Sequence, residues 1–124
     1  MIIAGRGVIC SPDGPALLFQ LSEKARIPIA ITLLGLGSFD ESRPEPIHML
    51  SVYGAVYANY AVQNADLILA LGARLDERAV GDPTQFAPKA RVAGRDNCGG
   101  IIQLDIKPEN VNKVVETTGA VMET

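Results

Sequence analysis

The sequence predicts a three-layer α/β sandwich with a mainly parallel sheet of five or six strands. Three observations support this fold class. The apolar runs are short and almost continuously apolar, which is typical of strands buried on both faces. These runs alternate with helical patterns, as in βαβ units. The chain has 124 residues, of which 48% are hydrophobic and 20% charged, as expected for one globular domain. The predicted fold is therefore Rossmann-like.

The first half of the chain supplies two strands and one helix. Residues 2–5 (IIAG) form a short apolar run that ends in glycine, and we expect a strand there. Residues 11–28 carry leucines at helical spacing, with Pro15 suited to the first helical turn and Pro28 ending the pattern. Residues 27–35 (IPIAITLLG) form a second β-branched run that again ends in glycine, which predicts the next strand.

The second half continues the alternation. Residues 51–66 predict a helix of small and aromatic residues, in which Tyr53, Tyr57 and Tyr60 have helical spacing and are expected to pack. The runs at 67–72 (LILALG) and 101–106 (IIQLDI) predict two further strands, and 119–122 (GAVM) one more. The glycine-rich residues 94–100 are expected to form a flexible loop.

Composition and isolated residues exclude several classes of function. The formal net charge of −3 gives no reason to expect a nucleic acid or an anionic membrane as partner. No apolar run approaches the roughly 20 residues of a membrane span, and no secretory signal pattern follows Met1. Cys10 and Cys98 lie far apart and are expected to be free thiols in a reducing compartment. The single histidine, His48, supports neither a metal site nor a catalytic triad, so no catalytic or metal-ligating residue is predicted.

Glycine and charge gather where the predicted strands end. In an open parallel sheet, ligands bind outside the carboxyl ends of the strands. Gly5, Gly72 and Asp105 lie at such ends, and Gly35 closes the second run. The charged stretch 74–78 follows Gly72 directly, and its two arginines are suited to phosphate oxygens. Asp105 is suited to accept hydrogen bonds from a ribose.

Each of these features has a second interpretation. Gly5-Arg6-Gly7 is a lone GxG in which Cys10 replaces the third glycine of the dinucleotide fingerprint, so an ordinary strand-to-loop turn would also explain it. The charged stretch could be a solvated loop with weak internal ion pairs. Asp105 could instead cap the turn formed by residues 107–110.

Three segments carry a resemblance to a known family. Residues 35–41 (GLGSFDE), 48–78 and 99–115 (GGIIQLDIKPENVNKVV) resemble the central domain of the acetolactate synthase (acetohydroxyacid synthase) catalytic subunit, and most closely its fungal members. The similarity runs from Ile2 to Val121. That family belongs to the thiamine-diphosphate enzymes, which have three α/β domains. The resemblance implies that the outer domains carry thiamine diphosphate and Mg²⁺, whereas the central domain binds FAD, mainly as a structural cofactor.

The resemblance also implies which positions contact FAD. They lie after the first strand, after the second, after the 67–71 run and in the last segment. These positions are Gly5, Gly7, Thr32, Leu33, Gly72, Ala73, Arg74, Asp76, Arg78, Asp105, Ile106 and Asn110.

The chain departs from the family pattern on the flavin side. Ser51-Val52-Tyr53-Gly54 stands where the family has a glycine-methionine-histidine-glycine segment. Leu34 replaces a glutamine, Glu77 an aspartate and Cys10 a polar residue. A divergent central domain that binds ADP or no nucleotide, and serves only as a structural or interaction module, is the alternative interpretation.

For the whole enzyme, the resemblance implies condensation of pyruvate with a second 2-oxo acid in branched-chain amino-acid biosynthesis. Residues 1–124 are then expected to be a single central domain without catalytic residues, and the chain alone is expected to be inactive. Its expected partners are the outer thiamine-binding domains, further copies in a homo-oligomer and a regulatory subunit. A fungal protein of this kind would lie in the mitochondrial matrix, and any other in the cytoplasm.

Overall fold

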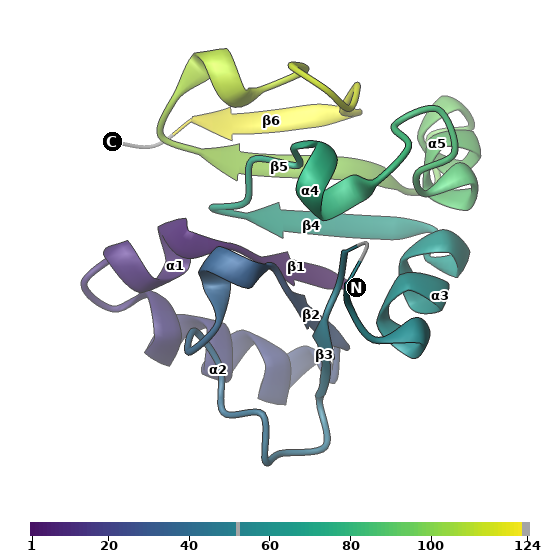
Figure 1. The fold of residues 1–124 in the computed structure, drawn as a ribbon. Helices are drawn as coiled ribbons and strands as arrows, with labels where there is room; N and C mark the ends of the chain where they lie inside the picture. Colours follow the sequence, from purple (N-terminus) through teal and green to yellow (C-terminus); the bar gives the residue numbers. More distant parts are fainter. Residues whose placement is uncertain (52, 123–124) are drawn as a thin grey trace.

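The computed structural model describes residues 1–51 and 53–122. Figure 1 shows a single sheet with helices packed against it. The sheet has six strands in the order β3-β2-β1-β4-β5-β6, and every neighbouring pair is parallel. The α/β sandwich with a parallel sheet is therefore confirmed. The strands are β1 (Ile2–Ala4), β2 (Ile29–Ile31), β3 (Pro46–Met49), β4 (Leu67–Leu71), β5 (Gly100–Asp105) and β6 (Gly119–Met122).

Five α-helices and two short 3₁₀ helices connect the strands. The α-helices are α1 (Arg6–Cys10), α2 (Gly14–Ala25), α3 (Val56–Asn64), α4 (Glu77–Val80) and α5 (Pro88–Arg95). The 3₁₀ helices are η1 (Leu33–Gly35) and η2 (Pro108–Asn110). In Figure 1, α1 and α2 lie on one side of the strands, whereas α3 and α5 lie on the other. The three layers thus follow from helices on both faces of the sheet.

The core consists of two clusters, one on each face of the sheet. On one face Ile3, Ile68 and Ile101 are fully buried in a cluster that includes residues of α3 and α5. On the other face Ile2 and Ile29 are fully buried in a cluster that includes Val8 of α1 and Leu18 of α2. Successive residues of a strand point to opposite faces of the sheet, so where both faces are covered, successive residues must all be apolar. This explains the continuous apolar runs.

The first strand lies at the centre of the sheet. Ile3 pairs with Ala30 on one side and with Ala70 on the other. The amino group of Met1 donates a hydrogen bond of 2.7 Å to the carbonyl of Leu67, across 66 positions of sequence. Burial lowers the pKa of this amino group from its ordinary 8.0, although the nearby Asp66 carboxylate acts in the opposite direction.

The structure corrects three expectations about individual elements. The second strand ends at Ile31 and not at Gly35, because residues 33–35 turn into η1. The strand β3 was not predicted, and the helix α5 occupies a stretch in which no element was predicted. This helix includes Gly94 and Arg95, which were expected to lie in a loop.

The packing expected for three tyrosines is wrong. The exposed fractions of Tyr53, Tyr57 and Tyr60 are 91%, 57% and 71%. The buried positions of α3 are instead Ala58 and Val62, which pack on the sheet. Tyr57 and Tyr60 occupy exposed positions of α3, and Tyr53 lies before the helix begins.

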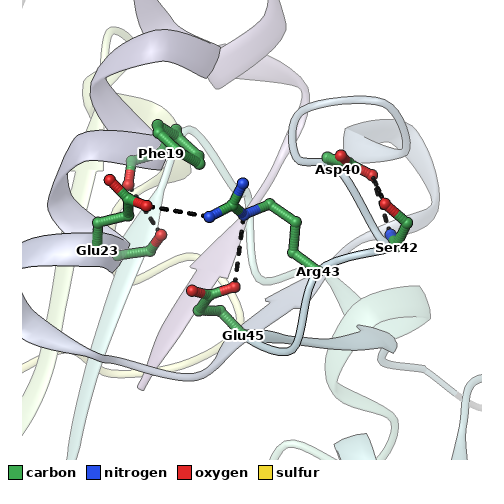
Figure 2. A network of polar contacts seen from close by, with 7 residues as sticks. Phe19, Glu23, Asp40, Ser42, Arg43 and Glu45 are labelled. Carbon is green, nitrogen blue, oxygen red and sulfur yellow. Dashed lines mark hydrogen bonds and ion pairs between the residues drawn. The ribbon is translucent and has the colours of Figure 1, made fainter.

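A charged cluster joins α2 to the segment that enters β3 (Figure 2). The Arg43 guanidinium lies 3.0 Å from a carboxylate oxygen of Glu23 and 3.7 Å from one of Glu45. Its central carbon is 4.4 Å from the centre of the Phe19 ring, which is a cation–π contact. Arg43 therefore links the long 36–45 connection to α2.

Candidate functional site

The strand order reverses between β1 and β4. The chain passes from β1 to β2 and β3 on one side of the sheet, and then returns to β4 on the other side of β1. Connections leave the two central strands in opposite directions, so their carboxyl ends flank a crevice where open α/β sheets bind ligands. Gly5 follows β1 and Gly72 follows β4, so both predicted strand ends meet at this switch point.

The glycines at the switch point bring two loops into direct contact. The amide of Gly5 donates to the carbonyl of Leu71 at 2.9 Å, and that of Gly7 to the carbonyl of Gly72 at 3.1 Å. A Cβ on Gly7 would lie 2.6 Å from the Cα of Gly72. Gly72 also has a φ of +58°, a backbone conformation that residues with a side chain rarely adopt. These glycines are thus explained by the packing of one loop on the other at the switch point.

The charged loop after β4 is partly ordered by its own contacts. Arg74 pairs with Asp76 at 3.3 Å, with both side chains well exposed. An oxygen of Asp76 accepts a hydrogen bond of 3.2 Å from the amide of Ala79 and so caps α4. Leu75, with a φ of +52°, is buried in the core and anchors the loop. The interpretation as a solvated loop with an internal ion pair therefore describes Arg74 and Asp76 well.

Two groups in this loop remain available for a ligand. Arg78 lies on α4 with its side chain exposed, and no ion pair within 4.0 Å joins it to any of the residues described. The amide N–H of Arg74 likewise has no hydrogen-bond acceptor within residues 1–51 and 53–122, whereas Ala73 is only 2% exposed and lies in the core. Guanidinium and backbone N–H groups are the donors that phosphate oxygens require.

Asp105 is engaged in the turn that follows β5. Its Oδ1 accepts a hydrogen bond of 2.9 Å from the amide of Lys107. The side-chain amide of Asn110 lies 3.2 Å from each carboxylate oxygen. The alternative in which Asp105 caps this turn is thus what the structure shows, and Asn110 acts as its partner. Ile106, between them, is 67% exposed.

The end of β2 contributes an apolar surface to the same edge of the sheet. The amide of Thr32 donates to the carbonyl of Ala4 at 3.0 Å, which holds it beside the end of β1. Leu33 and Leu34 follow, and their exposed fractions are 60% and 53%. The structure therefore brings all four predicted segments to one edge, with apolar side chains from β2 and β5 and charged ones from β4.

Gln103 is a polar residue of this region that the sequence analysis did not single out. It lies within β5 and is 1% exposed, and its Nε2 donates to the carbonyl of Ala73 at 3.1 Å. Its signal in the sequence was a single amide side chain inside an otherwise apolar run. Buried amides need partners, so such a residue marks a specific contact.

Ser51, the first residue of the 51–54 segment, lies beside a cavity of about 260 Å³. Ser51, Asn59 and Gly81 contribute to its lining, between the end of β3, α3 and α4. The side chain of Asn59 hydrogen-bonds both the amide and the carbonyl of Ser51, at 3.1 and 2.8 Å. Val52, part of this departure, lies outside the described residues.

Asp82 also lines this cavity and has a perturbed pKa. The hydroxyl and the amide of Thr84 donate to its Oδ1 at 2.7 and 2.9 Å. These two hydrogen bonds hold the pKa of the carboxyl below its ordinary 3.8. The larger hollow, about 700 Å³, lies at the opposite end of the sheet and includes Glu23, Pro28 and Glu45 in its lining.

Among the residues described, no three or more histidine, cysteine, aspartate or glutamate side chains are grouped so as to hold a metal ion. No helix in the described part of the chain is long and apolar enough to cross a membrane.

Comparison with known proteins gives one family and many relatives. Residues 1–123 match the family model described as "Thiamine pyrophosphate enzyme, central domain". The chain is 52% identical, over 98% of its length, to the mitochondrial acetolactate synthase catalytic subunit of Aspergillus candidus. It is 50% identical to that of Saccharomyces cerevisiae over 98% of its length, and 37% identical to the acetolactate synthase isozyme 1 large subunit of Escherichia coli over 92%. In each case it spans 18% of the relative's length.

Proposed function

This chain belongs to the family of thiamine pyrophosphate enzyme central domains, and from that membership we propose that it is the FAD-binding central domain of an acetolactate synthase. The family and the resemblance to acetolactate synthases follow from the similarity itself. Binding of a flavin nucleotide, and the activity of a whole enzyme, are the steps that we add. Residues 1–124 would form one domain of that enzyme, and the thiamine-binding domains would lie outside it.

One observation supports the nucleotide site most strongly. The segments that the resemblance implies contact FAD follow β1, β2, β4 and β5, and all four lie at one edge of the sheet, around the point where the strand order reverses. That point is where doubly wound α/β sheets bind dinucleotides. The positions that the resemblance implies and the topology of the sheet are thus consistent with the same edge.

The residues at this edge fit the chemistry of FAD. The side chains of Arg74 and Arg78 and the N–H of Arg74 offer donors for diphosphate oxygens. The exposed Leu33 and Ile106 offer apolar contacts to a ring system or a ribityl chain. Asp105 retains acceptor capacity beyond its contacts within the turn, because a carboxylate has about four lone-pair sites. When bound, the flavin would supply mainly structural support.

For the whole enzyme we propose the activity of the relatives. Thiamine diphosphate and Mg²⁺, held by the outer domains, would supply the chemistry that joins pyruvate to a second 2-oxo acid. The central domain would contribute nucleotide binding and contacts with those domains, with further copies of the subunit and with a regulatory subunit. The fungal relatives are named mitochondrial, so we propose the mitochondrial matrix as the location.

A second candidate function is a structural module that binds ADP or no nucleotide. It is favoured by the engagement of Asp105 with Lys107 and Asn110, which occupies part of the expected ribose acceptor. It is also favoured by Tyr53, which is 91% exposed where the family has a flavin-side segment.

Titration of FAD and ADP into the purified chain tests the proposal. We expect FAD to bind and to give the protein flavin absorbance. Replacing Arg74 or Arg78 by alanine should weaken binding by roughly ten- to a hundredfold, because a hydrogen bond to a charged group contributes about 1.5–3 kcal/mol. The sheet should be unaffected, so the melting temperature should change little.

The matched control is Arg95→Ala. Arg95 is an exposed arginine at the carboxyl end of α5, in the connection that enters β5 at the other end of the sheet. Its loss should leave FAD affinity unchanged. Binding of ADP without FAD would favour the second candidate, and equal affinities in the wild type, Arg74→Ala and Arg78→Ala would exclude a role for the charged loop.

A further inference from the structure

Gln103 connects the two loops that border the candidate site. It lies at the middle of β5, where it pairs with Ala70 of β4. Its side chain is 1% exposed, and its Nε2 donates to the carbonyl of Ala73 at 3.1 Å. The same nitrogen lies 3.5 Å from the carbonyl of Asn110. Ala73 belongs to the loop after β4, and Asn110 to the turn after β5.

A sheet of this kind does not need an amide at this position. The neighbours on the same face of the sheet, Ile68, Ala70 and Ile101, are fully buried apolar residues. A leucine or isoleucine would gain free energy from burial, whereas a buried amide is tolerated only when it finds partners. The partners of Gln103 are carbonyls of loops and not of the sheet, so its contribution is to the loops.

The bond to Ala73 determines the direction of the next amide. The carbonyl of Ala73 and the N–H of Arg74 belong to one planar trans peptide unit, so they point in opposite directions. Gln103 holds that carbonyl toward the buried interior of the sheet. The N–H of Arg74 must then point away from the interior, and it has no acceptor within residues 1–51 and 53–122.

We propose that Gln103 is a positioning residue for the nucleotide site, because it orients the Ala73–Arg74 peptide so that the Arg74 amide faces a diphosphate. The Arg74 side chain extends from the same residue. The orientation of this peptide therefore also influences the direction in which the side chain leaves the backbone. Gln103 itself does not contact the ligand. This inference rests on the proposed function and adds to it a residue that lies outside the predicted set.

The variant that tests this is Gln103→Met. Methionine has nearly the same length and volume as glutamine but no donor, so the strand keeps its packing while the carbonyl of Ala73 loses its partner. We expect the affinity for ADP or FAD to fall about three- to tenfold, since one neutral hydrogen bond is lost. We also expect the backbone order parameter of Arg74, measured by ¹⁵N relaxation, to fall from about 0.85 toward 0.6.

The matched control is Gln63→Met. Gln63 also ties two segments through its side-chain amide, donating to Gln85 at 2.7 Å and accepting from Ala87 at 2.8 Å. These bonds join α3 to the segment before α5. Gln63→Met should lower stability while leaving the Arg74 order parameter and the nucleotide affinity unchanged. If Gln63→Met reduced affinity as much as Gln103→Met, the effect would be one of general stability, and the inference would be wrong.

A second variant, Gln103→Glu, provides a conservative rescue. An ionised carboxylate would face two carbonyl oxygens and could donate to neither, whereas a protonated carboxyl could donate one hydrogen bond. Burial would raise the pKa of the introduced group, and the Asp105 carboxylate on the same strand would raise it further. We expect Gln103→Glu to bind nucleotide more tightly near pH 5, where a protonated carboxyl can donate, than near pH 8, where a buried carboxylate would repel both the carbonyl oxygens and the diphosphate.

The outcomes separate this inference from the proposed function. Failure of the wild-type chain to bind either FAD or ADP would refute the proposed function. The effect of Gln103 on the order of the Ala73–Arg74 peptide would still be tested by the Arg74 order parameter. An unchanged order parameter in Gln103→Met would overturn the inference, whether or not nucleotide binds.

Discussion

Gly7 and Gly72 touch through their backbones at the point where the strand order reverses. A Cβ on Gly72 would lie 2.5 Å from the Cα of Gly7, closer than real Cβ contacts allow. The loop after β1 and the loop after β4 therefore form one continuous backbone surface. Because that surface contains no side chains from these positions, its shape depends on the glycines themselves.

Replacing Gly72 by alanine should destabilise the protein strongly. The φ of +58° imposes strain on alanine, about 1–3 kcal/mol, and the clash with Gly7 adds about 1–3 kcal/mol of overpacking. Urea unfolding would measure the difference. Gly81→Ala is the control, because Gly81 has a φ of +71° but nothing within 4 Å of the added Cβ. Equal losses of stability in the two variants would show that the contact with Gly7 contributes nothing.

Replacing Arg43 by alanine should lower the free energy of unfolding by about 1 kcal/mol. The variant loses two ion pairs of partly exposed groups, each contributing well under 1 kcal/mol, and the contact with Phe19, about 0.5–1 kcal/mol (Figure 2). Lys24→Ala is a suitable control, since Lys24 is exposed on α2, the helix that carries Phe19 and Glu23. Denaturant unfolding would show both effects, and a loss no larger in Arg43→Ala than in Lys24→Ala would contradict the structural role of the cluster.

The hydrogen bonds from Thr84 should be visible in the titration of Asp82. They depress the pKa of the folded state below 3.8, so their contribution to stability is present above about pH 3.8 and is lost as the pH falls through the lower folded value. In Thr84→Val the hydroxyl donor is gone, and the pKa of Asp82 should move up toward 3.8. NMR titration of the side-chain carboxyl would measure it. A pKa that stays the same in Thr84→Val would show that the amide alone causes the shift.

The 124-residue chain alone should form no acetolactate from pyruvate. The resemblance places thiamine diphosphate and Mg²⁺ in the outer domains, so the residues that hold them are expected outside residues 1–124. An acetolactate assay with thiamine diphosphate, Mg²⁺ and FAD present would check this. The matched positive control is an intact relative such as the Saccharomyces cerevisiae enzyme, and turnover by the chain alone would contradict the assignment of roles to domains.

The central strands could be predicted from the sequence because each is a short, mainly apolar run. β1 is buried at every position, whereas in β4 and β5 buried positions alternate with partly exposed ones that are still mainly apolar. β3 lacks that pattern. It is an edge strand with an irregular register against β2, it begins at Pro46, and His48 has a φ of +64°. No local propensity indicates such a strand, because its pairing depends on β2.

The same distinction applies to the site. Glycines and charges at strand ends could be found because topology alone gathers them at one edge. Their partners could not be found, because each depends on a contact between distant segments. Gln103 reaches Ala73 across 30 positions, and Gly5 meets Gly72 across the switch point. Sequence therefore predicted where a ligand could bind, whereas the interactions that order the loops became clear only from the structure.

The central position of β1 has a consequence for how the chain folds. β1 needs β4 as its second neighbour, and the hydrogen bond from Met1 to Leu67 spans 66 positions. Closing so long a loop costs conformational entropy before any pairing is gained, and non-local parallel pairing of this kind folds slowly. During synthesis, the edge of β1 that pairs with β4 must remain unpaired until residues 67–71 have left the ribosome. The first strand of the sheet to be made therefore gains its second neighbour only after β2 and β3 have been synthesised.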